Sequence, residues 1–332
     1  MLSKWLEELE QIHTVADLRD WRESRNTICI DNMDLSLLSY VDAYLGQYHE
    51  TEAFDVRKFV SEDLSCIMYR DIPVIYHGSN NWSPRRLGPP ETLSGLMDKW
   101  RKHLHGLLDK LQVPVYLAIV PEKDVVVREL LGHGEQNYYL HGAAQCFADE
   151  FRGRLAGVTS INDVINSPDS SVRNYRYYDS HLLSRDYLKI FICAIQSFGL
   201  ASRVDWSSIQ LKSDSIYGDL AVKLGRQSPK EEFLSLHCNN ESAALVDGHP
   251  TFSSPLRSTY QIFSNPSSNL DAKVALFGDS HCSVYAQKKL TYLFANTFSR
   301  CDFYWDSMCV NSQDKARYAD FVFLEISQRF LF

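Results

Sequence analysis

The chain has 332 residues and a formal net charge of −8, with 34 Lys and Arg residues against 42 Asp and Glu residues. This acidic balance, without any basic run or stripe, excludes a general nucleic-acid binder. Apolar residues make up 45% of the chain and charged residues 23%, as in ordinary globular domains. No segment has the roughly 20 consecutive apolar residues that span a bilayer, so we expect no membrane span.

The eight cysteines are scattered and include no C-x-x-C pair, so the sequence predicts no metal site. Several of them, such as Cys193, lie in apolar runs, where a reduced cysteine packs as a small core residue. This usage is typical of a reducing compartment. Residues 1–10 carry acidic side chains at helical spacing and no continuous apolar region, so we expect no signal peptide and a cytoplasmic protein.

In chain order, the first half of the sequence alternates between helical and strand patterns. Residues 3–25 have helical periodicity, whereas residues 26–31 and 73–76 are typical of short strands. Apolar residues recur at helical spacing between 91 and 111, after a proline-rich loop. The continuous apolar run at 113–120 then indicates a buried strand of a parallel sheet.

The second half continues this pattern with one interruption. We expect helices at 144–157 and 183–198, a strand that ends at Gly278, a helix at 284–294 and a last strand at 321–324. Residues 200–270 are polar and rich in turns, and we interpret them as an insertion that serves as a binding lobe or a lid.

This order of elements predicts an α/β protein with three α/β/α layers and a central, mostly parallel sheet. We expect residues 1–70 to form an N-terminal helical extension that packs on the core. Residues 71–332 would then form the main domain, interrupted by the insertion at 200–270.

The run Lys273-Val-Ala-Leu-Phe-Gly-Asp-Ser280 places a serine hydroxyl at the carboxyl end of an apolar strand. In open α/β sheets ligands bind at that edge. A helix that begins just after Ser280 would direct free backbone N–H groups toward it, as an oxyanion site requires. Ser280 is therefore a candidate nucleophile. The alternative is a turn and helix cap without chemistry, and Asp279 is expected to brace this turn.

A serine nucleophile needs a base, and the base needs an acid that orients it. Asp179 and His181 are two residues apart, so in an extended segment both side chains leave the same face. The alternative is an Asp and a His in an ordinary polar loop. His281 is adjacent to Ser280 along the backbone and is expected to point away from it, so His181 is the preferred base.

Several blocks of the sequence together resemble the alginate O-acetyltransferase family of SGNH-like proteins, in the family's order and across about residues 70–332. They are His77-Gly-Ser-Asn-Asn-Trp82, Val113-Pro-Val-Tyr-Leu-Ala-Ile-Val-Pro-Glu-Lys123, Tyr177-Tyr-Asp-Ser-His181, Phe277-Gly-Asp-Ser280 and Phe323-Leu-Glu-Ile-Ser-Gln-Arg329-Phe-Leu331. The resemblance implies an SGNH-like fold with Ser280 as nucleophile, His181 as general base and Asp179 as its orienting acid.

The chain also shares the family's order of Asp and His before Ser, the reverse of ordinary SGNH esterases. It departs from the family at Leu182, where a Trp is usual, and at His281, where an aromatic residue is frequent. Both changes are expected to border the active site, and they leave the donor and acceptor preferences open.

The resemblance implies an O-acetyltransferase that moves an acetyl group onto a hydroxyl of a polysaccharide through an acyl-serine intermediate. Its partners would be a carbohydrate acceptor and proteins of polysaccharide biosynthesis. Two alternatives remain, a carbohydrate esterase with the same triad and a non-catalytic glycan-binding subunit. No bound cofactor is expected. Acetyl-CoA is the natural donor in the cytoplasm, whereas the family resemblance favours the periplasm.

Four further residues are candidates for substrate binding. Tyr177 and Tyr178 would stack on pyranose rings or, alternatively, be buried in the core. His281 and Arg329 border the other motif residues, and an ion pair between Arg329 and Glu325 that secures the last strand is the favoured interpretation. Backbone N–H groups near Ser280 and Ser283 are the expected oxyanion donors.

Overall fold

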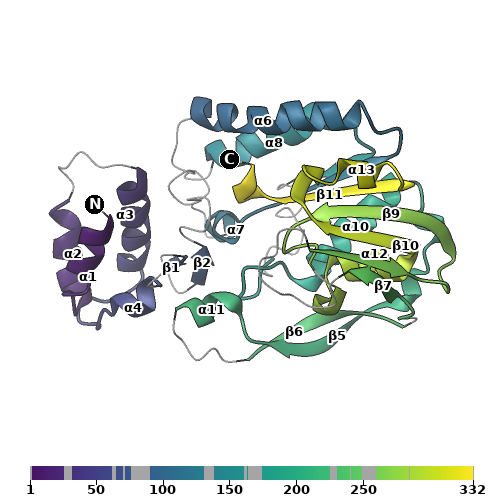
Figure 1. Cartoon of the computed structure of the whole chain (residues 1–332). Helices are drawn as coiled ribbons and strands as arrows, with labels where there is room; N and C mark the ends of the chain where they lie inside the picture. Colours follow the sequence, from purple (N-terminus) through teal and green to yellow (C-terminus); the bar gives the residue numbers. More distant parts are fainter. Residues whose placement is uncertain are drawn as a thin grey trace.

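A computed structural model of the chain describes residues 2–25, 32–61, 65–69, 72–75, 90–130, 138–160, 163, 174–224, 230–239, 241–248, 259–283 and 285–331 (Figure 1). The expected strand at 26–31 and the motif block at 77–82 lie outside these residues. Within them, no helix combines the length and the apolar character that a membrane crossing needs.

The N-terminal part is mainly helical. It consists of α1 (Leu2–Leu9), α2 (Val15–Glu23), α3 (Asn32–Leu45), α4 (Val56–Phe59) and a hairpin of β1 (Cys66–Tyr69) and β2 (Ile72–Ile75). The predicted helical stretch at 3–25 divides in two because Thr14 caps α2. Its hydroxyl accepts a hydrogen bond from the Asp17 N–H at 3.1 Å, and the Asp17 carboxylate accepts one from the Thr14 N–H.

These N-terminal elements supply most of a hydrophobic cluster that includes Trp5, Trp21 and Phe59. Val127 of α7 (Lys123–Leu130) and Leu220 of α11 (Asp219–Lys223) complete the same cluster. The N-terminal part therefore packs directly on two helices that flank the candidate site. The expected domain boundary at residue 70 stays a prediction.

The centre of the protein is a seven-stranded sheet with the order β4-β3-β11-β9-β10-β8-β7. The strands from β4 to β10 in this order are parallel to their neighbours, whereas β8 pairs antiparallel with both β10 and β7. The strands are β3 (Val115–Val120), β4 (Gly157–Thr159), β7 (Ala244–Gly248), β8 (Tyr260–Ser264), β9 (Leu270–Gly278), β10 (Phe298–Trp305) and β11 (Phe321–Ser327). The predicted mostly parallel sheet is confirmed.

Helices cover both faces of this sheet (Figure 1). On β3, Leu117 and Ile119 pack toward α6 (Pro90–Leu108) and α8 (Tyr138–Phe151). The alternate residues of β3, such as Tyr116, pack toward α10 (Ser184–Ser197) and α12 (Leu290–Thr297). Because both faces are buried, β3 must be apolar throughout, which is the pattern seen in the sequence. The predicted α/β/α layering is confirmed.

The segment interpreted as an insertion contains two different structures. β5 (Ile209–Ile216) and β6 (Glu231–Cys238) form a separate antiparallel hairpin, with α11 between them in the chain. By contrast, β7 and β8 belong to the central sheet. The last part of residues 200–270 is therefore sheet, and the hairpin with α11 is the part that stands outside it. The short helix α13 (Gln313–Ala316) precedes the final strand β11.

The helix predicted at 284–294 is wrong at its start. α12 begins only at Leu290, and a short 3₁₀ turn, Tyr285–Gln287, comes before it. Ser283 and Lys288 have positive φ angles of 57° and 50°, which an α-helix does not contain. No α-helix therefore starts directly behind Ser280.

We predict that Phe323→Ala lowers the free energy of unfolding by about 3–5 kcal/mol, because it leaves a cavity in the middle of the sheet. The Phe323 ring is fully buried and lies 5.7 Å from the ring of Tyr116 and 4.9 Å from that of Phe294. Denaturant unfolding would measure the change. Tyr318→Ala is the control, since Tyr318 is 75% exposed and its loss should cost about 0.5 kcal/mol or less. Equal effects of the two substitutions would contradict the packing described.

Candidate active site

Ser280 lies just beyond the carboxyl end of β9, at the edge of the sheet where the sequence placed it. Its side chain is partly exposed, whereas both neighbours, Asp279 and His281, are buried. At Gly278 a side chain has no room, because a Cβ atom there would lie 2.5 Å from the Cys282 Sγ and 2.7 Å from a carboxylate oxygen of Glu325. The glycine thus allows the chain to turn tightly against β11.

Asp279 braces this turn, as expected. Its Oδ1 accepts a hydrogen bond from the His281 N–H at 3.0 Å, and its Oδ2 accepts one from the Ser327 hydroxyl at 2.6 Å. Burial opposes ionisation of Asp279, but these donors and the nearby positive charge of Arg329 keep its pKa below the ordinary value. The backbone of Ser280 is therefore held by an ionised, buried carboxylate.

The Asp179/His181 segment forms a closed loop. A β-bridge joins Tyr175 to Leu182, and the Leu183 N–H donates to the Asn174 carbonyl at 2.8 Å. Within this loop the chain turns, so it is not the extended segment on which the sequence argument relied. The contact itself is present, since His181 Nδ1 lies 2.6 Å from Asp179 Oδ1, which also accepts the His181 N–H at 2.9 Å.

Asp179 is held in its ionised form. Burial disfavours the carboxylate, but the hydrogen bond from His181 and the charge of Arg176 lower the pKa of Asp179 well below its usual range. Arg176 Nη1 lies 3.2 Å from Asp179 Oδ2. Because a carboxylate only accepts hydrogen bonds, the Nδ1 of His181 carries the proton and Nε2 is left as the basic nitrogen.

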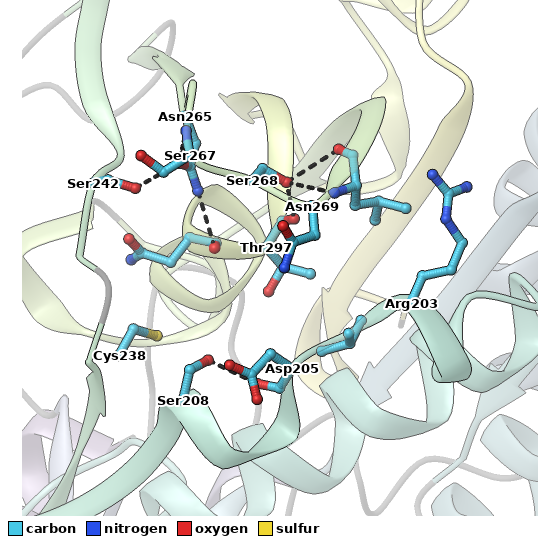
Figure 2. Close-up of a pocket in the computed structure, with 13 residues that line it drawn as sticks. Arg203, Asp205, Ser208, Cys238, Ser242, Asn265, Ser267, Ser268, Asn269 and Thr297 are labelled. Carbon is cyan, nitrogen blue, oxygen red and sulfur yellow. Dashed lines mark hydrogen bonds between the residues drawn. The ribbon is translucent and has the colours of Figure 1, made fainter.

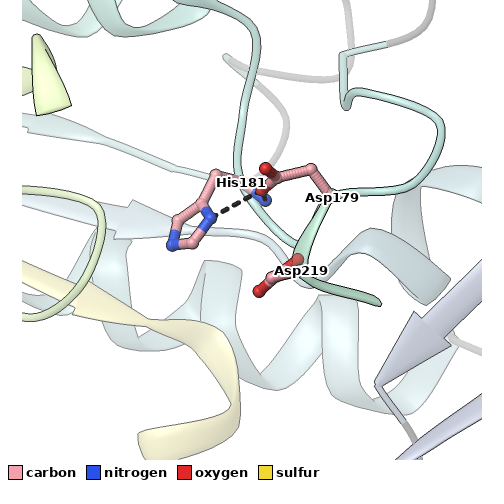
Figure 3. A group of neighbouring side chains, drawn as sticks. All are labelled: Asp179, His181 and Asp219. Atoms are coloured by element: carbon pink, nitrogen blue, oxygen red, sulfur yellow. Dashed lines mark hydrogen bonds and ion pairs between the residues drawn. The ribbon is translucent and has the colours of Figure 1, made fainter. Parts of the chain in front are cut away.

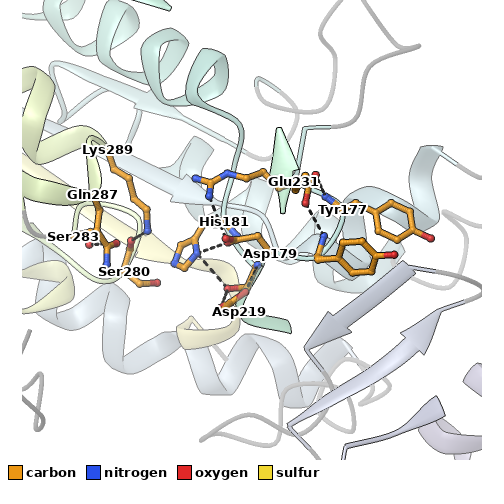
Figure 4. A network of polar contacts seen from close by, with 12 residues as sticks. Tyr177, Asp179, His181, Asp219, Glu231, Ser280, Ser283, Gln287 and Lys289 are labelled. Atoms are coloured by element: carbon orange, nitrogen blue, oxygen red, sulfur yellow. Dashed lines mark hydrogen bonds and ion pairs between the residues drawn. The ribbon is translucent and has the colours of Figure 1, made fainter. Parts of the chain in front are cut away.

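The basic nitrogen of His181 is buried and has no hydrogen-bond partner among the described residues. Figure 4 shows the imidazole between Asp179 and Ser280. The structure thus joins Asp179 to His181 and places the imidazole on the side of Ser280, without a hydrogen bond between His181 and Ser280 among the described residues. The catalytic roles of the three residues stay predictions. Leu182, the first departure from the family pattern, is fully buried in the core and pairs with Tyr175 in the bridge that closes this loop.

His281 does not point away from the site, contrary to expectation. Its ring lies 5.4 Å from the ring of His181, in an edge-to-face arrangement. Its Nδ1 lies 2.8 Å from the Tyr187 hydroxyl. Burial lowers the pKa of His281 well below the ordinary value, so the ring is neutral. His281 therefore packs against the candidate base, with one ring nitrogen already engaged.

Tyr177 and Tyr178 flank the loop on its other side. Their backbone N–H groups donate to the two carboxylate oxygens of Glu231, at 2.5 and 3.1 Å, and the Tyr177 carbonyl accepts from Lys123 at 2.5 Å. In Figure 4 the Tyr177 ring lies beyond Asp179, away from Ser280. A role of these tyrosines in sugar binding stays a prediction.

The predicted ion pair between Arg329 and Glu325 is wrong. Arg329 Nη1 donates to the two carboxylate oxygens of Glu122, at 2.8 and 2.9 Å. Glu325 instead accepts the Asp279 N–H at 2.7 Å. Burial, followed by the charge of Asp279, raises the pKa of Glu325 well above the ordinary value, so this side chain is neutral. Spacing of four residues indicates a contact on a helix, but Glu325 lies in a strand.

The carboxylates near His181 form a group that the sequence did not predict. Ligand atoms of Asp179, His181 and Asp219 lie within 4.8 Å of one another, a spacing at which they could hold a metal ion (Figure 3). They are already engaged, however. Asp179 binds His181, and Asp219 accepts the N–H and the hydroxyl of Ser180 at 2.8 and 2.6 Å. We therefore interpret the contacts of Asp179 and Asp219 as holding the loop that carries His181.

A separate polar pocket lies beside the end of α12 (Figure 2). Its polar groups bind one another and cap the helix. The Asn265 amide donates to the Asn296 carbonyl at 3.0 Å, and the Ser268 hydroxyl donates to the Thr297 carbonyl at 2.6 Å. This pocket therefore has a structural explanation, and it contains none of the predicted site residues.

The structure is similar to the O-acetyltransferase domain of AlgJ from Pseudomonas putida, with a TM-score of 0.50 at 14% sequence identity, over 80% of this chain and 92% of that domain. At the level of fold, the chain resembles the alginate O-acetyltransferase family. The resemblance seen in the sequence is thereby confirmed for the fold.

Two further structures match with lower scores. PatB1 from Bacillus cereus has a TM-score of 0.45 at 12% identity, over 80% of this chain and 96% of PatB1. AlgX from Pseudomonas aeruginosa has a TM-score of 0.41 at 11% identity, over 75% of this chain and 57% of AlgX. No protein-family model matches the chain, and no curated protein matches it either.

We predict that Arg329→Met lowers the free energy of unfolding by about 3–5 kcal/mol, because it leaves the buried Glu122 without its partner. Burial, opposed by Arg329, already raises the pKa of Glu122 to about 6. In a double-mutant cycle measured by denaturant unfolding, Glu122→Gln should remove most of this loss. Glu325→Gln should leave the loss of stability caused by Arg329→Met largely unchanged. If Glu325→Gln removed this loss and Glu122→Gln did not, Arg329 would pair with Glu325, as the sequence predicted.

Proposed function

We propose that the protein is a serine O-acyltransferase that moves an acetyl group onto a hydroxyl of a polysaccharide. The observation that carries the proposal is the state of His181. Its Nδ1 is fixed by the ionised Asp179, and its buried Nε2 has no partner among the described residues and lies on the side of Ser280. A histidine in this state is ready to accept a proton from a neighbouring hydroxyl.

In the proposed reaction, Ser280 Oγ attacks the carbonyl carbon of an acetyl donor while its proton passes to His181 Nε2. The tetrahedral intermediate then collapses, the donor's leaving group takes that proton, and an acetyl-serine remains. A sugar hydroxyl attacks the acetyl-serine next and gives its proton to His181, which returns it to Ser280. The donor is a separate molecule, acetyl-CoA if the protein is cytoplasmic.

The negatively charged oxygen of the tetrahedral intermediate needs hydrogen-bond donors. The structure limits the backbone N–H groups that are available for this role. The Ser283 N–H, expected as one donor, is already bound to the Asp279 carbonyl at 2.9 Å, and the His281 N–H is bound to the Asp279 side chain. The Ser280 N–H has no partner in the described parts of the chain. We therefore propose the Ser280 N–H as a backbone donor, in place of a helix N-terminus.

Similarity to known proteins supports an acetyl group as the transferred group and a polysaccharide as the acceptor. The AlgJ domain with which this chain shares its fold is an O-acetyltransferase domain. The motif blocks that resemble the alginate O-acetyltransferase family include all three residues of the proposed triad. Together with the engaged state of Asp179 and His181, this favours acyl transfer over a purely structural role of the fold.

We predict that an activated aryl acetate acetylates Ser280, which intact and peptide-level mass spectrometry would detect. Ser280→Ala should give no adduct on that peptide. Asp179→Asn should slow adduct formation roughly 10³–10⁴-fold, because it removes the acceptor that fixes the His181 tautomer. His181→Ala should abolish the adduct within the time of the assay.

Ser283→Ala is the matched control for this experiment. Ser283 lies in the same turn, but its hydroxyl donates to the Gln287 side chain at 2.5 Å and is buried. Its loss should leave the Ser280 adduct in place. Absence of any adduct on Ser280 in the wild-type protein would reject the acyltransferase and favour the non-catalytic glycan-binding subunit.

A second prediction separates transfer from hydrolysis. When the acetylated protein is mixed with oligosaccharides, loss of the acetyl-serine should speed up and acetylated sugar should form. Mass spectrometry of the protein and of the sugar would follow both events. Loss at an unchanged rate, with acetate as the product, would instead identify a carbohydrate esterase that uses the same triad.

A further inference from the structure

We propose that Lys289 is a positioning residue that holds the backbone of Ser280 in its reactive geometry and gives the site a positive charge. This inference rests on the proposed function. The Lys289 side chain enters the site from the residue just before α12, and its Nζ donates to the Ser280 carbonyl oxygen at 2.9 Å (Figure 4). Lys289 is only 4% exposed.

The hydrogen bond from Lys289 matters because its acceptor, the Ser280 carbonyl, is part of the backbone that orients the Ser280 side chain. The Ser280 carbonyl belongs to the peptide plane between Ser280 and His281, so fixing it fixes the ψ angle of Ser280. With ψ fixed, the direction in which the Ser280 side chain leaves the backbone toward His181 is set. The other side of this peptide is already held, since the His281 N–H binds Asp279. Lys289 and Asp279 thus hold the two polar groups of one peptide.

The turn needs such a contact because no helix follows it directly. Between Ser280 and α12 the chain passes through left-handed backbone at Ser283 and at Lys288. A helix would have fixed this segment by its own hydrogen bonds. Here the ammonium group of Lys289 donates a hydrogen bond to the Ser280 carbonyl and so links the two ends of the segment.

The charge of Lys289 is unusual for a purely structural contact. In the described residues no carboxylate forms an ion pair with it, although burying an unpaired charge is costly. The charged and titratable groups around the site are Asp179, His181 and Arg176 on the loop, Asp219 on α11, and Asp279 and His281 on the turn. A neutral donor would make the same hydrogen bond at a lower cost, so we assign the charge a role.

Burial lowers the pKa of Lys289 to about 8, while Asp179 opposes this change. Below that pH the ammonium is present, and it is lost as the pH rises through about 8. The acylation rate should therefore fall above pH 8 if the charge is needed. Burial also lowers the pKa of a second lysine, Lys123, to about 8, so the test must separate the two.

The experiment measures the rate of Ser280 acetylation by an aryl acetate, as a function of substrate concentration and pH. Lys289→Met should lower the maximal rate about 10²-fold with little change in KM, because the nucleophile is misplaced while the substrate still binds. Lys289→Arg keeps a charge that does not titrate, so it should retain part of the rate and lose the decline above pH 8. Lys123→Arg should keep that decline.

Two controls exclude a general structural effect. Lys288→Met changes the adjacent residue, whose ammonium group contacts the His237 ring at 3.2 Å, and should leave the acetylation rate within about twofold. The melting temperature of Lys289→Met at pH 7 is measured beside the rates, because the substitution leaves the Ser280 carbonyl without its donor. A loss of rate in a variant that is still folded at the assay temperature excludes a general loss of structure.

The outcomes are distinct. Acetylation of the wild-type protein together with an unchanged rate in Lys289→Met would overturn this inference and leave the proposed function standing. A decline above pH 8 that persists in Lys289→Arg and disappears in Lys123→Arg would also overturn it. Lack of acetylation in the wild-type protein would overturn both. If Lys289→Met does not fold, the pH profiles of the wild-type protein and of Lys289→Arg still decide.

Discussion

The candidate site depends on one buried carboxylate, Asp279, which ties the end of β9 to the end of β11. One of its oxygens accepts the His281 N–H, and the other accepts the N–H and the hydroxyl of Ser327. β9 and β11 are neighbours in the sheet, so this contact converts strand pairing into a fixed position for the turn. Because Ser280 lies between Asp279 and His281, the position of the candidate nucleophile is determined by the pairing of β9 with β11.

The candidate base is positioned in a different way. Its loop is held by side chains from outside the sheet, with Glu231 of β6 and Asp219 of α11 accepting backbone N–H groups and Lys123 donating to a backbone carbonyl. Both carboxylates belong to the segment interpreted as an insertion. That segment therefore sets the position of His181 relative to Ser280, whatever else it binds. Ser280 is therefore held at the edge of the central sheet, and His181 is held in a loop that is fixed by side-chain hydrogen bonds.

The parts that the sequence predicted are those that depend on local pattern. A strand buried on both faces, such as β3, must be continuously apolar, and Asp179 and His181 are recognisable by residue type within a block that resembles the family, although the segment turns where an extended one was expected. The rest depends on contacts distant in the sequence. Arg329 pairs with Glu122, 207 residues away, and no local spacing reveals this. Likewise, the apolar periodicity at 284–294 is real, but it does not show that Ser283 and Lys288 adopt left-handed backbone.

The distribution of buried charge supports the catalysis proposed above over the alternative of glycan binding alone. Arg176, Asp179, Asp279 and Lys289 are all buried, and all act on the two short segments that carry His181 and Ser280. Because apolar residues of similar volume often stabilise a fold as well as buried ion pairs do, these four charges are better explained by the proposed chemistry than by stability alone. A reaction in which charge develops on a serine and a histidine gains from dipoles and charges that are already fixed, whereas a sugar-binding surface works with exposed polar groups.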